Sequence, residues 1–109
     1  MPQRQMSFVY QDELRLPHEP TIPIDSAAWF AWLATATRFA YQPPGHTCRL
    51  TLRREERRHH SYWYAYLRYD RKLHNAYAGR SETLTSARLQ QVFTCIMTRV
   101  ARQQQERAA

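Results

Sequence analysis

The stretch Tyr62-Trp63-Tyr64-Ala65-Tyr66-Leu67-Arg68-Tyr69 is the most β-prone run of this chain, because aromatic residues dominate it. Side chains alternate along a strand. The even-numbered residues therefore share one amphipathic face, and the odd-numbered ones, which include Trp63 and Leu67, share an apolar face. A polar link at 70–72 follows, and residues 73–78 run back as a second strand before Gly79. The sequence predicts a β-hairpin with one face in the core.

A third strand is expected before this hairpin. Residues 48–54 alternate between apolar side chains such as Leu50 and Leu52 and polar side chains such as Arg49 and Arg53, which is typical of a half-buried strand. The highly charged residues 55–61 connect this segment to the hairpin. Consecutive strands joined by short links usually lie side by side, so we predict a three-stranded antiparallel meander.

Capping signals predict two helices. Asp25 suits the N-cap of a helix over residues 27–37, and Thr85 suits the N-cap of a helix over residues 86–104. Apolar residues recur at helical spacing in both segments. They are Trp29, Trp32, Leu33 and Ala36 in the first helix, and Leu89, Val92, Phe93, Ile96 and Val100 in the second. Because a three-stranded sheet needs cover on one face, the second helix should lie against the face that carries Trp63.

The predicted fold is therefore α+β: a three-stranded antiparallel meander covered by a long C-terminal helix, with a second N-terminal helix. A length of 109 residues suits a single domain, 1–109, with its sheet-and-helix core at 48–100. Residues 1–24 are expected to be an N-terminal extension. Within it, residues 6–10 and 14–16 suit a small hairpin, and the prolines at 17, 20 and 23 argue against a helix or a central strand.

Composition limits the compartment. Cys48 and Cys95 lie 47 positions apart without a CxxC pair, which argues against a zinc site or a disulfide framework and suits a reducing cytosol. No apolar run approaches the roughly 20 residues that span a bilayer, and the N-terminus lacks the charged-then-apolar order of a signal peptide. We therefore expect a cytoplasmic protein without a membrane partner.

The positive charge is unevenly distributed. The formal net charge is +7, of which residues 1–47 contribute −1, residues 48–80 contribute +6 and residues 81–109 contribute +2. The cations thus coincide with the aromatic strands. A basic surface interleaved with aromatic side chains is typical of a nucleic-acid interface, while a merely solvated face is the alternative explanation.

Catalytic and metal-binding patterns are missing from the sequence. His59-His60 follow Glu55-Glu56, but adjacent residues in a strand or loop point apart and do not converge on one metal. No base is identifiable beside any of the tyrosines, and two glycines in the whole chain do not form a phosphate-cradling loop. We expect neither an enzyme nor a cofactor, and no metal.

One family resemblance concerns the second half of the chain. The stretch 62–66, then Lys72, the pair Gly79-Arg80 and the helix start at 84–92 are similar to the arm-type DNA-binding domain of phage-type tyrosine integrases, which is related to the plant Apetala-type fold. That resemblance covers about residues 48–100. It implies a mobile-element context and an open sheet face that enters the DNA major groove, as β-ribbon readers do.

A second resemblance spans most of the chain. Its motifs are Trp29-x-x-Trp32-Leu33, Phe39-x-Tyr41, Arg53-x-Glu55-x-Arg57, Tyr62-Trp63-Tyr64-Ala65-Tyr66, Tyr77-x-Gly79 and Leu84-Thr85-x-x-Arg88-Leu89. This combination resembles the N-terminal module of some large LuxR-type regulators from soil Chloroflexi, which implies a transcription-regulation context. A P-loop, a helix-turn-helix and the Arg-His-Tyr set of an integrase are all missing, so either family would make this chain an accessory domain.

The predicted function is a small basic nucleic-acid-binding module; double-stranded DNA is the expected ligand, and the sequence does not decide between DNA and RNA. The residues expected on the open sheet face are Arg49, Arg53, Tyr64, Tyr66, Arg68 and His74, and those expected at its margins, meeting phosphates, are Arg57, Arg58, Arg71, Lys72 and Arg80. The alternative is a protein–protein interaction or regulatory accessory domain that uses the same face, because Tyr and Arg are also enriched at interface hot spots.

Overall fold

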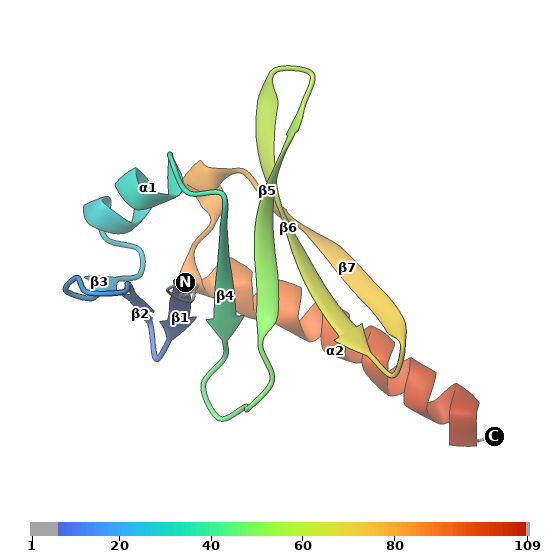
Figure 1. Cartoon of the computed structure of the whole chain (residues 1–109). Coiled ribbons are helices and arrows are strands. Elements are labelled where there is room, and N and C mark those ends of the chain that lie inside the picture. Colours follow the sequence, from blue (N-terminus) through green and yellow to red (C-terminus); the bar gives the residue numbers. More distant parts are fainter. Residues whose placement is uncertain (1–6, 109) are drawn as a thin grey trace, which may run out of the picture.

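A computed structural model describes residues 7–108 of the chain (Figure 1). The elements in chain order are β1 (Phe8–Tyr10), β2 (Glu13–Arg15), β3 (Ile22–Pro23), α1 (Ala27–Leu33), β4 (Arg38–Gln42), β5 (Leu50–Arg57), β6 (His60–Tyr69), β7 (Lys72–Gly79), the 3-10 turn η1 (Ser81–Thr83) and α2 (Ser86–Ala108). The predicted N-terminal hairpin is present as β1 and β2, although Met6, which the prediction included, lies outside the described residues.

The sheet corrects the predicted fold. It has seven strands in the order β3-β2-β1-β4-β5-β6-β7, with β1 and β4 parallel and every other pair antiparallel. The meander of β5, β6 and β7 exists, but the three-stranded sheet is wrong, because β4 pairs with the outer edge of β5. The N-terminal extension is likewise part of the sheet and supplies three short strands. Pro23 is tolerated because β3 is an edge strand.

The face of the sheet that packs against α2 contains the core. Trp63 and Ala65 of β6 are fully buried, as the alternation predicted, and the ring centroids of Trp63 and Phe39 lie 5.2 Å apart. Helix α2 runs behind the sheet in Figure 1. Its predicted apolar stripe is buried, and the Thr85 hydroxyl accepts a hydrogen bond from the Arg88 amide at 3.2 Å. The predicted C-terminal helix is confirmed and extends four residues beyond 104.

The start of α1 differs from the prediction. Ser26, not Asp25, is its N-cap and accepts a hydrogen bond from the Trp29 amide at 3.2 Å. Asp25 has a φ of 71°, and its Oδ1 accepts the Ser86 amide at 2.9 Å instead. Asp25 therefore caps α2, 61 positions away, and ties the N-terminal segment to that helix. The Trp29 indole strengthens the same junction by donating to the Leu84 carbonyl at 2.8 Å.

The free edge of the sheet is covered by α2. Arg88 donates to the carbonyls of Tyr77 and Ala78, at 2.9 and 3.1 Å, and Arg99 donates to the carbonyl of Asn75. These bonds occupy backbone acceptors of β7 that an unprotected edge strand would offer to another chain. Extension of the sheet through β7 is therefore opposed.

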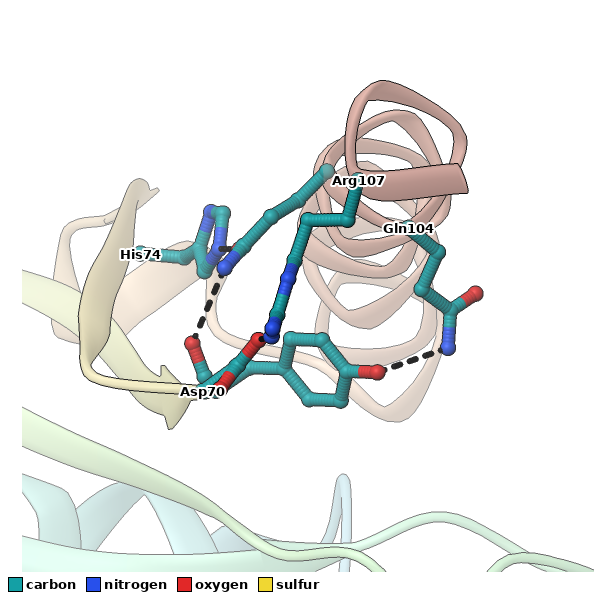
Figure 2. A network of polar contacts seen from close by, with 6 residues as sticks. Asp70, His74, Gln104 and Arg107 are labelled. Atoms are coloured by element: carbon teal, nitrogen blue, oxygen red, sulfur yellow. Dashed lines mark hydrogen bonds and ion pairs between the residues drawn. The ribbon is translucent and has the colours of Figure 1, made fainter. Parts of the chain in front are cut away.

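The end of α2 is fastened to the β6–β7 turn. Figure 2 shows Arg107 directed at Asp70, with which it forms an ion pair, and Gln104 reaching a tyrosine hydroxyl, that of Tyr69. The contact positions the C-terminal turns of the helix beside the turn. No helix within residues 7–108 is long and apolar enough to cross a membrane.

Candidate nucleic-acid interface

The face of the sheet opposite α2 is open, and four tyrosines gather on it. Tyr62, Tyr64 and Tyr66 lie at alternate positions of β6, and Tyr77 of β7 pairs with Tyr64. We call these four residues the tyrosine cluster. The rings of Tyr64 and Tyr77 meet edge to face with centroids 5.6 Å apart, and those of Tyr62 and Tyr77 are 6.0 Å apart. The contacts of Tyr77 with Tyr62 and Tyr64 orient these three rings.

Arginines lie over three rings of the tyrosine cluster. The guanidinium carbon is 5.3 Å from the ring centroid for Arg57 over Tyr64, 5.6 Å for Arg53 over Tyr66 and 5.8 Å for Arg80 over Tyr62. Two further pairs on the same face involve aromatic rings of β1. They are Arg49 over Phe8 at 4.5 Å and Arg15 over Tyr10 at 5.5 Å.

Five such pairs are more than a chain of this size ordinarily has. Significant cation–π contacts occur about once per 70–80 residues, so one or two would be expected in 109. All five lie on one face, which shows that the alternation of the strands segregates arginine and aromatic side chains together. Within the described residues this face carries seven arginines against two glutamates, Glu13 and Glu55. The arginines are Arg15, Arg38, Arg49, Arg53, Arg57, Arg68 and Arg80.

The negative charge of one of the two glutamates, Glu55, is already balanced by a partner within the protein. The Tyr66 hydroxyl donates to Glu55 Oε2, and Arg57 donates to Glu55 Oε1 at 3.0 Å. These two hydrogen bonds, that from Tyr66 first, hold the pKa of the Glu55 carboxyl below its usual value. The same bond to Glu55 raises the pKa of the Tyr66 phenol. Glu55 therefore stays ionised at neutral pH and positions Tyr66, while the excess of positive charge on the face persists.

The β5–β6 hairpin extends beyond its neighbours (Figure 1). The pairing with β4 reaches only Arg53 of β5, and the pairing with β7 reaches only Trp63 of β6, so the tip is a two-stranded ribbon. Its turn, Arg58-His59, has φ angles of 52° and 71°. The ribbon holds Arg58 away from the body of the sheet, while the Arg57 guanidinium reaches back over the Tyr64 ring.

The position of Arg80 is fixed by the base of this ribbon. The Arg80 guanidinium nitrogen lies 2.9 Å from His60 Nδ1, and because a guanidinium only donates, Nδ1 is the acceptor of this hydrogen bond. The His60 ring in turn lies 6.2 Å from that of Tyr62. Arg80, predicted at the margin, is thus drawn onto the tyrosine cluster.

The structure does not bring all the predicted site residues together. Arg53, Tyr64, Tyr66 and Arg68 lie on the open face of the meander, as expected, and so does Arg57, which was expected at its margin. Arg49 lies just before β5 and covers Phe8. Arg58 and Arg71 occupy the turns at opposite ends of β6, roughly 33 Å apart at the rise of a ten-residue strand, and are not brought together.

Two predicted residues lie elsewhere. His74 is only 5% exposed on the α2 side, where its Nε2–H donates to Gln103 Oε1 at 2.6 Å. Lys72 lies beside it and lines a cavity of about 300 Å³ with Arg99. The reason is the register of the two-residue turn. Tyr69 pairs with Lys72, so Leu67, a residue of the core face, pairs with His74, and every even-numbered residue from 72 to 78 faces the core side.

Several residues of the face were not predicted as site residues. Tyr62 and Tyr77 were within reach of the sequence, because the alternation that selects Tyr64 also selects Tyr62, and a correct register selects Tyr77. Phe8, Tyr10 and Arg15 were not. They join this face through the parallel pairing of β1 with β4, which brings together residues about 32 positions apart and leaves no periodic signal.

Metal and family comparisons add no assignment. Within residues 7–108, no three His, Cys, Asp or Glu side chains are grouped so that they could hold a metal ion. No family model matches the chain, and neither a curated protein nor a solved structure is similar enough to match it. The function must therefore be argued from the open face itself.

Proposed function

We propose that this protein is a nucleic-acid-binding module, not an enzyme, and that its ligand lies across the open face of the sheet. The observation that carries the proposal is the set of five arginine–aromatic pairs on that face. Nucleic acids offer phosphates and flat bases together. Arginine binds phosphate through a planar fork of donors, and aromatic rings stack on bases.

The charge distribution supports the same ligand. The open face carries seven arginines and only two glutamates. One of the glutamates, Glu55, already accepts hydrogen bonds from Tyr66 and Arg57. A surface with this excess attracts polyanions, and its arginines can replace the counterions that phosphates hold. A cytoplasmic location is part of the proposal. A regulatory or mobile-element context rests on the two family resemblances alone.

A protein partner is the second candidate. Leu73 and Tyr77 on β7 are 49% and 48% exposed, and both belong to the open face. Exposed apolar and aromatic side chains beside arginines are also typical of protein interfaces. The two functions differ in their response to salt. Binding to phosphates releases counterions and weakens steeply, whereas a tyrosine-centred protein contact changes little.

The test is a binding titration by fluorescence anisotropy at 50 and 200 mM salt. Labelled nucleic acids of mixed sequence serve as ligands for the wild type and for Arg53→Ala. Arg102→Ala is the matched control, because it also removes one exposed arginine but from α2. We expect salt-sensitive binding that Arg53→Ala weakens and Arg102→Ala preserves. No binding at low salt would favour the protein partner.

A further inference from the structure

We infer that the ligand of the open face is a single-stranded nucleic acid, in place of the duplex that the sequence led us to expect. This inference rests on the proposed function and narrows it. Single-stranded DNA and RNA share the chemistry concerned, and the experiment below separates them.

The width of the sheet argues against a duplex. Seven strands spaced about 4.8 Å apart form a surface roughly 29 Å across, whereas the major groove is about 12 Å wide. A two-stranded ribbon fits such a groove, but here only the tip of the β5–β6 hairpin is narrow enough. Tyr64, Tyr66 and Tyr77 lie on the body of the sheet, and only Tyr62 lies at the base of the ribbon, so bases stacked inside a duplex would stay out of reach of three of the four rings.

Tyr77 is the ring of the cluster most available to an unpaired base, because arginines lie over Tyr62, Tyr64 and Tyr66. Tyr77 is 48% exposed, and Tyr62, Tyr64 and Tyr66 are half-buried in the open face. Every base has a flat surface that stacks on an aromatic ring, but that surface is free only where the strand is unpaired. Because the edge-to-face contact with Tyr64 already orients Tyr77, a base that stacks there orders no additional tyrosine.

Two rows of side chains run across the strands and define a path. In the first row Phe8, Ala40, Thr51 and Tyr66 are successive register partners on β1, β4, β5 and β6. Ala40, which is buried, and Thr51, which is half-buried, have small side chains, so the two rings of this row lie at its ends. Three strand spacings amount to about 14 Å, the length of about four stacked nucleotides at roughly 3.4 Å each.

The second row lies beside the first and supplies cations. Arg38, Arg53, Tyr64 and Tyr77 are register partners across β4, β5, β6 and β7. A strand that stacks a base at either end of the first row has its phosphates beside the two arginines of the second. Cations beside aromatic rings on one surface are the combination that binds a single strand.

The experiment compares three 15-nucleotide ligands of the same sequence: single-stranded DNA, single-stranded RNA and double-stranded DNA. Anisotropy titrations are made at low salt with the wild type, Tyr66→Ala and Tyr66→Phe. Tyr77→Ala is added because that ring lies on the edge strand and its loss disturbs the fold least; circular dichroism checks that each variant folds. Ultraviolet crosslinking followed by mass spectrometry then locates the contacted residues.

We expect at least one single strand to bind about tenfold more tightly than the duplex. Tyr66→Ala should weaken that binding roughly 5- to 100-fold and Tyr66→Phe should preserve it, because stacking needs the ring and not the hydroxyl. Crosslinks should fall on Phe8 or the tyrosine cluster. The tighter of the two single strands identifies the source, since only RNA has the 2′-hydroxyl.

Two kinds of result would refute the single-strand ligand, and only the second would also refute nucleic-acid binding. Duplex binding as tight as that of both single strands, or crosslinks confined to Arg58 and His59 at the hairpin tip, would refute the single-strand ligand and leave nucleic-acid binding in place. No binding of any of the three ligands would remove the proposed function itself and favour a protein partner.

Discussion

Replacing Trp63 tests the assignment of the two sheet faces. The side chain is fully buried, its indole N–H donates to the Ser81 hydroxyl at 2.8 Å, and its ring lies against Phe39. Truncation of a buried tryptophan to alanine costs about 3–5 kcal/mol. A domain of this size has a free energy of unfolding of about 5–15 kcal/mol, so Trp63→Ala should leave the protein marginally stable or unfolded.

A graded series makes this prediction measurable. Trp63→Phe keeps most of the packing but removes the hydrogen bond to Ser81 and some ring volume, and should cost about 1–2 kcal/mol. Tyr64→Ala, one position along the strand, should cost about 1 kcal/mol or less, because its ring lies on the open face and makes cross-strand contacts only. Urea denaturation followed by circular dichroism gives the three values. A larger loss for Tyr64→Ala than for Trp63→Ala would refute the face assignment.

Three further predictions concern contacts that hold the sheet and α2 together. Asp25→Ala should lower the free energy of unfolding by about 0.5–2 kcal/mol, because Ser86 loses its acceptor, and Asp25→Asn should lower it less; equal losses in urea denaturation would contradict the cap. Burial and then the charge of Asp12 raise the pKa of Tyr41 from 10.0 to about 12, so the free energy of unfolding should fall as the pH rises from about 10 to about 12. An absorbance titration of the wild type and of Tyr41→Phe checks this. If both proteins lack a tyrosine that ionises near pH 12, or both have one, the raised pKa of Tyr41 is refuted. His74→Ala should cost about 1–3 kcal/mol by leaving a buried amide oxygen unpartnered, yet leave nucleic-acid affinity unchanged; weakened binding by a folded His74→Ala variant would return His74 to the interface.

The strongly periodic parts of the fold were predictable from the sequence. Residues 50–53 of β5 and 62–69 of β6 alternate in side-chain character, and α2 carries an apolar stripe behind a Thr85 cap, so these signals identify each element and its buried face. The position of Trp63 in the core follows from the same alternation. Local chemistry alone decides these features. The predicted connection at 55–61 is wrong: residues 55–57 and 60–61 extend the two strands, and only Arg58 and His59 form the turn.

The remainder of the sheet depends on long-range pairing. Strands β1, β2 and β3 contain two or three residues each, too few to show a period, and they become part of the sheet only through the parallel contact of β1 with β4. Asp25 was read as the cap of the nearest helix because sequence shows only neighbours, whereas the carboxylate reaches Ser86 instead.

The candidate site was predictable in the same uneven way. Arg53, Tyr64, Tyr66 and Arg68 follow from alternation within one hairpin. His74 was misplaced because a turn of two residues, and not three, sets the register of β7. Which arginine lies over which ring could not be predicted, because it depends on how neighbouring strands are aligned in the sheet.

The most direct test of nucleic-acid binding by the open face is the salt dependence of affinity for a single strand. If four arginines of the face each meet one phosphate, the logarithm of the binding constant should fall against the logarithm of salt concentration with a slope of about −3. Arg53→Ala should make the slope shallower by about 0.7, and Arg102→Ala on α2 should leave it unchanged. A wild-type slope near zero, or equal effects of the two substitutions, would contradict binding at this face.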